Sequence, residues 1–321
     1  MSGAAVLAGF GLDLAFGDPR RGHPVALFGR AAGALERAMW RPSRGAGAAY
    51  TLVLVGGCAL LGRRVPLVLA LFVALGGRSL GCEARRVAAL VEAGDVPGAR
   101  RAVTALVGRD PSALDGPELC RAALESVAEN TVDAVVAPLF WAAVGGAPGV
   151  LAHRAANTLD AMVGYRTERH GAFGWASARL DDAMNWPAAR LTAGATAALA
   201  PVVGGSPRAA LTIAPRDGAQ HPSPNGGWAE AAFAGALGVR LGGRNVYPER
   251  VEHRPHLGDG HAPTPADVHR AARLSLAVGA ACALLAAAAR ALLAPRTTPA
   301  TSFTRRSPRA PFARRTAGAR A

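Results

Sequence analysis

AVVAPLFWAAVGGAPGVLA, residues 134–152, is an apolar stretch that carries no charged residue. Its length approaches the roughly 20 residues that a helix needs to cross a bilayer. Pro138, Gly145, Gly146 and Pro148 nevertheless interrupt it. Such breaks are tolerated at membrane depth where protein or a cavity surrounds the backbone. The stretch therefore predicts a broken or re-entrant segment instead of a plain span.

The composition also indicates membrane embedding. Hydrophobic residues make up 50% of the 321 residues and charged residues only 18%, so a large soluble surface would be hard to cover. Apolar stretches at 191–214 and 274–294 are long enough to span, and Leu, Val and Ala recur at helical spacing in 79–107 and 118–133. Alternating strand patterns are scarce. We predict a mostly α, multi-pass integral membrane protein of the cell membrane, with broken or re-entrant helices and polar connecting segments.

The apolar stretch at 51–75 contains Arg63, Arg64 and Pro66. Two interpretations stay open for it. It forms two short helices, or it spans the bilayer while the arginine side chains reach out to the interface.

The charge of the chain is concentrated at one end. Of the formal net charge of +14, the seven arginines of residues 296–321 contribute half, and no acid accompanies them. We predict a single membrane-embedded domain over 1–295 and an Arg- and Pro-rich disordered tail over 296–321. The remaining charge is spread thinly and forms no nucleic-acid motif, so no nucleic-acid partner is expected. Every basic residue is Arg, which excludes a Walker A lysine and a Schiff-base mechanism.

Carboxylates precede the broken stretch at helical spacing. Glu125, Glu129 and Asp133 recur every four residues and fall on one helix face, with Asn130 beside them. Carboxylates entering an apolar segment repel one another unless a cation or an arginine lies opposite. Magnesium is one candidate, since it takes one or two protein carboxylates and completes its shell from water and phosphate. A solvated acidic helix face is the open alternative.

A polar segment follows the broken stretch: NTLDAMVGYRTERHGAFGWASARLDDAMNWPAARL, residues 157–191. It combines the acids Asp160, Asp181 and Asp182 with several arginines. Guanidinium groups are suited to bidentate recognition of phosphate or carboxylate, so we interpret the acids and arginines as functional. Its tryptophans and tyrosine are better explained as anchors at the membrane interface.

Two further segments carry weaker signals. Gly17, Asp18 and Pro19 form ordinary turn chemistry, and Asp18 could cap the backbone. HPSPNGGWAEAAFAGALG, residues 221–238, predicts a rigid turn leading into a helix that ends near Gly238. Free amides at 225–227 would form an anion site at the start of that helix. The scattered histidines lack the spacing of a zinc site.

Four blocks in order resemble the CobD/CbiB family of cobalamin biosynthesis. They are LDLAFGDPRRGHPVALFGR, ESVAENTVDAVVAPLFW, the segment 157–191 quoted above, and HPSPNGGWAEAAFAGALGVRLGG. The resemblance covers nearly everything from residue 11 to about 247. Arg166 and Arg216 stand where the family pattern leads us to expect Lys. After GVRLGG, the sequence RNVYPERVEHRPHLGDG replaces the expected Gly-rich ending.

The resemblance implies a multi-pass membrane enzyme, adenosylcobinamide-phosphate synthase. Such an enzyme joins aminopropanol or its phosphate to the remaining propionate carboxylate of adenosylcobyric acid, a corrinoid, through a new amide bond. ATP and Mg²⁺ are the expected cosubstrate and ion, and other membrane enzymes of the cobamide pathway are candidate partners. A membrane transporter or carrier, and a non-catalytic membrane subunit of the pathway, are the alternatives.

The resemblance also suggests roles for residues. Asp160 and His221 are the candidate catalytic residues, either of which would take the proton of the amine. The candidate Mg²⁺ ligands are Glu129, Asp133, Asp181 and Asp182. The candidate substrate- or phosphate-binding residues are Asp18, Asn130, Asn157, Arg166, Arg169, Arg179, Asn185 and Asn225.

These roles constrain the topology. If every apolar stretch spanned the bilayer, 125–133 and 157–190 would lie on opposite faces, and one site could not use both. We therefore predict that 134–152 breaks or folds back inside the bilayer.

Overall fold

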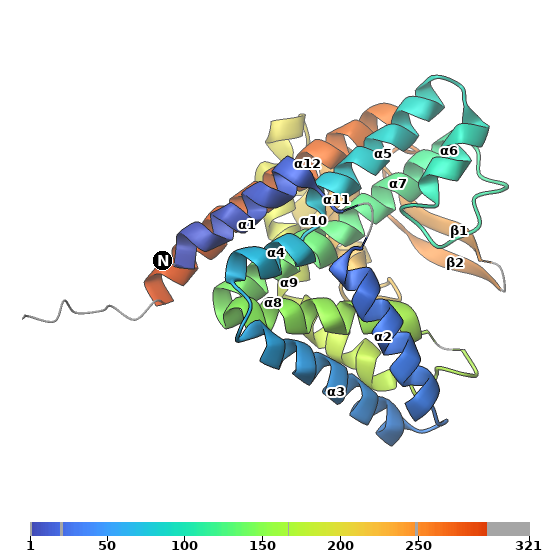
Figure 1. The fold of residues 1–321 in the computed structure, drawn as a ribbon. Helices are drawn as coiled ribbons and strands as arrows, with labels where there is room; N and C mark the ends of the chain where they lie inside the picture. Colours follow the sequence, from blue (N-terminus) through green and yellow to red (C-terminus); the bar gives the residue numbers. More distant parts are fainter. Residues whose placement is uncertain (1, 20–21, 166, 248–249, 294–321) are drawn as a thin grey trace, which may run out of the picture.

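The computed structural model describes residues 2–19, 22–165, 167–247 and 250–293, and most of these are helical (Figure 1). The predicted tail at 296–321 lies outside them. The helices are α1 Ser2–Phe16, α2 Pro24–Met39, α3 Arg44–Gly62, α4 Leu67–Ala74, α5 Gly77–Glu92, α6 Val96–Val103, α7 Gly116–Thr131, α8 Ala137–Val163, α9 Trp175–Leu199, α10 Pro207–Gly218, α11 Gly226–Leu237 and α12 Pro265–Leu293. A π-helical turn, η1 Val132–Val136, joins α7 to α8, and a 3₁₀ turn, η2 Ala200–Val203, follows α9. A hairpin of strands β1 Leu241–Tyr247 and β2 Arg250–Leu257 completes the fold.

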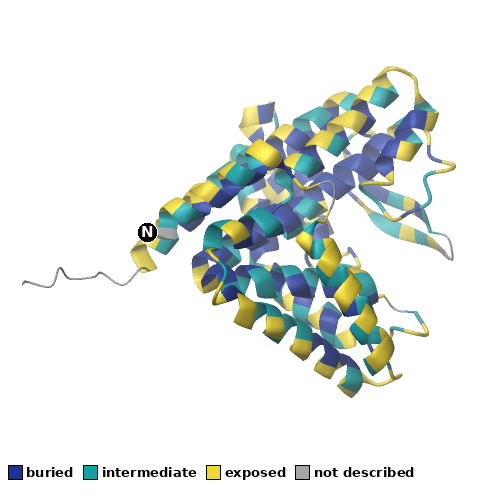
Figure 2. Ribbon diagram, in the orientation of Figure 1, coloured by how far each residue is buried: buried dark blue, intermediate teal, exposed yellow. Residues whose placement is uncertain are grey.

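Four helical segments of the described chain are long and apolar enough to cross a membrane: Arg44–Gly62, Leu67–Glu92, Gly116–Val163 and Pro265–Leu293. Large apolar side chains stand exposed along two of them, including Leu52 and Leu60 on α3 and Leu284 and Leu285 on α12. Figure 2 shows exposed positions along the outer side of α3. Exposed apolar surface of this extent is explained by contact with lipid. The mostly α, multi-pass membrane fold that the sequence predicts is confirmed.

The predicted spans have mixed outcomes. The stretch at 51–75 forms two helices, α3 and α4, and 274–294 lies within α12 apart from its last residue, which is not described. The prediction for 191–214 is wrong, because the helix stops at Leu199 and Gly204 takes a left-handed conformation before α10 begins. The β-hairpin was not expected. Its strands contain glycines, arginines and histidines, and this mixture hides the alternation that normally marks a strand.

The helix through 134–152 breaks at Gly146, where φ is 61° and ψ is −153°. Asn157 lies 24 residues after Asp133, and its Nδ2 donates a hydrogen bond of 3.1 Å to Asp133 Oδ2. A continuous helix would hold these residues about 36 Å apart. The chain therefore folds back, and the predicted break in 134–152 is confirmed.

Neighbouring helices pack closely around the break. A Cβ on Gly62, the last residue of α3, would lie 2.5 Å from Cα of Pro148, so only glycine allows this approach. Arg290 of α12 donates from Nη1 to the carbonyl oxygen of Ala143, one turn before the break, over 3.4 Å. Trp141 donates from Nε1 to the carbonyl oxygen of Met184 on α9, over 3.1 Å. The break is thus held by three other helices.

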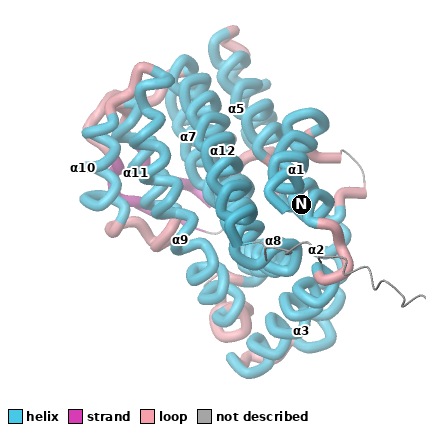
Figure 3. Tube along the Cα trace, turned by 90° about the vertical axis from the view of Figure 1, so that its left-hand side faces the viewer, coloured by secondary structure: helices cyan, strands magenta, loops and turns pink. Residues whose placement is uncertain are grey.

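Helix α12 lies in the middle of the bundle, and it contacts α1, α5, α7, α8 and α9 (Figures 1 and 3). The main core forms around it and includes Leu71, Leu124, Leu139 and Leu274. A second, smaller core of Ala32, Tyr50, Leu159, Val163 and Phe173 joins α2 and α3 to the second half of α8. The contact between Asp133 in η1 and Asn157 in α8 therefore joins the main core to the second core.

Replacing Gly62 by alanine is expected to destabilise the protein by about 1–3 kcal/mol, because the added methyl group would collide with the backbone at Pro148. Gly57→Ala on the same helix is the matched control. No atom lies within 4 Å of the Cβ position at Gly57, and alanine favours helix over glycine by about 1 kcal/mol. Thermal unfolding in detergent measures both variants. Equal midpoints for the two would contradict the close packing of α3 on the break.

Candidate active site

A network of hydrogen-bonded polar side chains connects η1, α8 and α9. Asn157 of α8 donates from Nδ2 to Asp133 Oδ2 over 3.1 Å and to Asp181 Oδ1 of α9 over 3.3 Å. Asn185 donates from its Nδ2 to both Asp181 oxygens, each over 3.1 Å. His153, which is fully buried, contacts Asn185 Oδ1 through Nε2 over 2.8 Å. The structure thus brings together four residues that the sequence singles out and adds His153.

The two carboxylates of this network, Asp133 and Asp181, lack a cationic partner among the described residues. Asp133 and Asp181 share the Asn157 amide, and within the described residues neither forms an ion pair of 4.0 Å or less with an arginine or histidine. Burial, followed by the negative charge of Asp160, raises the pKa of Asp181 to about 7. Two close carboxylates without a counter-ion favour binding of a cation.

Magnesium fits this pair better than the set of four predicted ligands. Among the described residues, no three His, Cys, Asp or Glu side chains converge as a protein-only metal cage requires. Magnesium needs only one or two carboxylates when phosphate and water fill its shell, and Asp133 with Asp181 meets that need. Glu129 and Asp182 do not join the pair in one such group.

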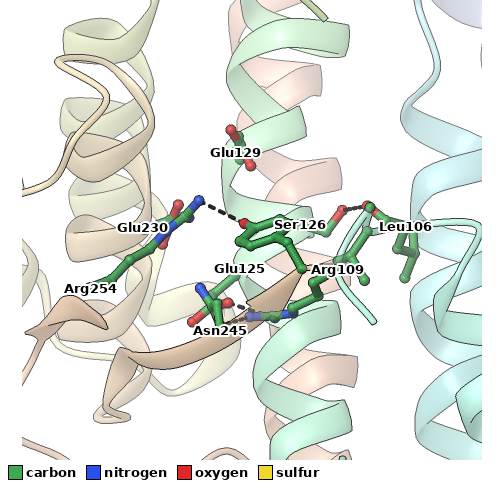
Figure 4. Close-up of a pocket in the computed structure, with 11 residues that line it drawn as sticks. Leu106, Arg109, Glu125, Ser126, Glu129, Glu230, Asn245 and Arg254 are labelled. Atoms are coloured by element: carbon green, nitrogen blue, oxygen red, sulfur yellow. Dashed lines mark hydrogen bonds and ion pairs between the residues drawn. The ribbon is translucent and has the colours of Figure 1, made fainter. Parts of the chain in front are cut away.

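Glu125, in contrast, is fully compensated. Its carboxylate accepts hydrogen bonds from Arg109 Nη2 over 2.7 Å, from Arg121 Nη1 over 3.1 Å and from the amide of Gly242 over 2.8 Å. Arg109 also binds Asn245 Oδ1. Arginines therefore lie opposite this carboxylate, and the open alternative of a solvated helix face does not hold for Glu125, which is buried. The contacts fix strand β1 to α7 (Figure 4).

Glu129 points into open space between α7 and the hairpin. It lines a cavity of 130 Å³ together with Glu230 and Arg254, and a larger cavity of 560 Å³ with His221 and Arg254. Figure 4 shows Arg254 reaching toward α7 from the hairpin. Arg254 donates from Nη2 to the Tyr247 hydroxyl over 3.0 Å. Burial and then the charges of Glu125 and Glu129 raise the pKa of Glu230 well above its ordinary value.

His221 is a neutral, buried imidazole. Burial and then the positive charge of Arg254 lower its pKa to about 4. The amide of Ser223 donates to Nδ1 over 3.1 Å. Nε2 lies 3.4 Å from Arg254 Nη1, which can only donate, and 3.7 Å from Glu230 Oε1. With Arg254 against Nε2, the ring is poorly placed to take a proton from an amine, and the catalytic role of His221 stays a prediction.

The turn before α11 differs from the predicted anion site. Ser223 Oγ already accepts hydrogen bonds from the amides of Asn225 and Gly226, over 3.3 and 3.0 Å. The Asn225 side chain instead accepts from Arg190 Nη1 over 2.7 Å and donates to the carbonyl oxygen of Asp182 over 2.8 Å. The helix does end at Gly238, in a left-handed conformation. Asn225 thus ties α11 to α9 at the site, and the amides of residues 225 and 226 are not free.

Asp18 and Asn130 line a different cavity beside α7. Together with Ser79 and Arg154 they line a cavity of 290 Å³. Asp18 pairs with His23 Nε2 over 3.3 Å, and Asn130 donates from Nδ2 to the carbonyl oxygen of Ser126 over 3.0 Å. This cavity and the cavity of 130 Å³ at Glu129 share Leu106 and Ser126 as lining residues. The two cavities therefore adjoin along α7.

Two of the predicted phosphate-binding arginines, Arg169 and Arg179, do not line these cavities. Arg169 donates from Nη2 to Glu36 Oε1 over 3.1 Å and stacks on the Trp40 ring at 4.8 Å. Arg179 is exposed and lies 3.6 Å from Asp182 Oδ2. Arg166 lies outside the described residues. A phosphate-binding role for these three arginines stays a prediction.

Sequence reasoning missed the cations that face the acids: Arg109, Arg121, Arg154 and Arg254. Arg154 lies two residues after the end of the apolar stretch 134–152, and an arginine so close to a membrane segment was an available signal. Arg254 belongs to the segment after GVRLGG, which matched no expected pattern. Its role depends on the hairpin, and the spacing of the sequence does not show that contact.

A helical membrane protein whose bundle encloses a carboxylate-rich polar site is the class that this fold and site define. The chain belongs to the CobD/CbiB family, because the family described as CobD/Cbib protein matches residues 6–275. This match extends beyond the resemblance, which ends near 247, and includes the β-hairpin.

Relatives named "Cobalamin biosynthesis protein CobD" resemble most of the chain. The one from Mycobacterium tuberculosis is 54% identical over 292 residues, which cover 88% of this chain and 93% of the relative. The one from Geobacter metallireducens is 44% identical over 315 residues, covering 90% and 96%. The one from Rhodobacter capsulatus is 44% identical over 292 residues, covering 83% and 90%. No solved structure matches the chain.

The pKa of Asp181 predicts how stability depends on pH. Because the folded pKa of about 7 exceeds the ordinary aspartate pKa of 3.8, the folded protein binds more protons than the unfolded chain at pH values between the two. The free energy of unfolding therefore falls as pH rises from about 4 to 7, by up to about 4 kcal/mol. Asp181→Asn removes this contribution. Thermal midpoints in detergent without divalent ions, from pH 5 to 8, are expected to fall less for the variant than for the wild type. Parallel pH profiles would refute the shift.

Proposed function

We propose that the protein is a cell-membrane enzyme of cobalamin biosynthesis and that it forms an amide bond. In this proposal it joins aminopropanol or its phosphate to the remaining propionate carboxylate of adenosylcobyric acid, with ATP as cosubstrate and Mg²⁺ as the ion. Family membership and the names of the relatives support the pathway. Other membrane enzymes of the cobamide pathway are the proposed protein partners.

The reaction needs an activated carboxylate. A carboxylate is a poor electrophile, so transfer of the γ-phosphoryl group of ATP to it would give an acyl phosphate and ADP. The neutral amine then attacks the acyl carbon, the amide bond forms, and phosphate leaves. The amine must lose protons, and the phosphate groups need compensating positive charge.

The pair Asp133 and Asp181 is the observation that carries this proposal. Both carboxylates lie beside the Asn157 amide without a protein cation. In the proposed reaction these two residues would hold Mg²⁺, and the ion would supply compensating positive charge for the phosphates. Asn157 and Asn185 orient the carboxylates by hydrogen bonds.

Asp160 is the proposed proton acceptor for the amine. It lies on the same helix as Asn157, and its charge influences that of Asp181. The cavity of 560 Å³ opens beside Glu129, Tyr165 and His221. We assign this cavity to the part of the corrinoid that carries the reacting propionate.

Mass spectrometry on the purified protein in detergent tests the function. The protein would be incubated with adenosylcobyric acid, aminopropanol or its phosphate, and magnesium ATP. We expect the cobinamide product together with stoichiometric ADP. Asp133→Asn keeps the size of the side chain but removes the charge that would hold the ion, and we expect it to lower product formation by about 10- to 100-fold.

Glu92→Gln is the matched control, because Glu92 lies half exposed at the end of α5, where it faces His269 at 3.9 Å. It is expected to leave product formation unchanged. Folded wild-type protein that gives no product with either amine would overturn the proposal in favour of a carrier or a non-catalytic membrane subunit. Full activity of Asp133→Asn would overturn the assigned ion site alone.

A further inference from the structure

Arg154 is a half-buried arginine whose donors are mostly unused. It lies on α8 within the apolar segment Gly116–Val163. Its Nε has no hydrogen-bond partner, and its Nη1 makes one long hydrogen bond of 3.4 Å to Asn157 Oδ1. Within the part of the chain that the structure describes, no carboxylate forms an ion pair with it. A guanidinium offers five N–H donors, so this group retains most of its binding capacity.

The surroundings of Arg154 make such a free cation costly. Asp133 and Asp18 are the acids whose charges act on it, yet neither contacts it directly. A charged side chain within a membrane segment usually faces a partner or a substrate pathway. Arg154 faces the cavity of 290 Å³. A ligand in this cavity could therefore supply the missing acceptors.

We propose that Arg154 binds an oxyanion, a phosphate or carboxylate group, of a small ligand in this cavity. The volume of 290 Å³ lies at the lower end of the roughly 300–1,000 Å³ typical of small-molecule pockets. Asp18 and Glu83 line the same cavity, and their carboxylates suit an ammonium group. The ligand class is therefore a small zwitterion with an oxyanion and an ammonium group.

This inference rests on the proposed function, because the zwitterion is assigned as the amine-bearing substrate. Asn157 connects the two parts of the site: its Oδ1 accepts from Arg154 and its Nδ2 donates to Asp133. The cavity at Arg154 also adjoins the cavity at Glu129 through Leu106 and Ser126. A zwitterion whose oxyanion is bound by Arg154 would thus lie near the carboxylates that are assigned to the ion.

Binding of O-phosphoethanolamine tests the proposal without turnover. Isothermal titration of the purified full chain in detergent is expected to show binding to the wild type. Arg154→Gln is expected to weaken binding at least about tenfold, because charge-assisted hydrogen bonds to the oxyanion are lost. Arg154→Lys keeps the charge without the planar fork, and we expect an intermediate affinity. Arg208→Gln, an exposed arginine of α10, is the control and should bind as the wild type does.

Any of three binding results would overturn the proposal: wild type that does not bind the probe at about 10 mM, unchanged binding by Arg154→Gln, or equal affinity for ethanolamine, which lacks the oxyanion. In the amide assay, Arg154→Gln should raise the KM of the amine substrate and leave that of ATP unchanged. A rise in the KM of ATP alone would assign the oxyanion to the nucleotide and also overturn the proposal. Probe binding that depends on Arg154 without any amide product would refute the function but retain the site.

Discussion

A helical backbone cannot reverse direction in an apolar layer without leaving peptide groups unpaired, and the break at Gly146 is where this chain meets that constraint. The positive φ of 61° is available to glycine at little cost. Arg290 binds the carbonyl oxygen of Ala143 before the break. Pro148 follows the break in the first turn of the new helix, where a missing N–H does no harm. The contact between Asp133 and Asn157 depends on this reversal.

Charge compensation determines the second feature, the attachment of the hairpin. Glu125 is buried on α7, and an unpaired carboxylate there would be strongly destabilising. Arg109 and Arg121 neutralise it, and Arg121 also donates to the carbonyl oxygens of Gly242 and Arg244. The same ion pairs therefore hold β1 in place. Because β2 pairs with β1, they also position Arg254 in the cavity that Glu129 and Glu230 line.

The sequence predicted the features that depend on local pattern. The apolar length, the breaks at Pro and Gly, and the spacing of Glu125, Glu129 and Asp133 were sufficient for a helical membrane fold with a reversal in 134–152. The span at 191–214 was wrong because hydropathy does not register the turn at Gly204. The attachment of the hairpin to Glu125 through Gly242 and the contact of Arg169 with Glu36 both span more than 100 residues. Composition and periodicity carry no information on such contacts.

Asn157 shows why an amide, and not an acid, stands at the centre of the site. Its Nδ2 donates to Asp133 and Asp181, while its Oδ1 accepts from Arg154. Aspartate at this position would add a third negative charge and would lose both donated hydrogen bonds. The amide thus separates two carboxylates that lack a cation from an arginine that lacks an anion. Opposite charges that are close but do not neutralise each other remain available to ligands, which is how electrostatic preorganisation of a site arises.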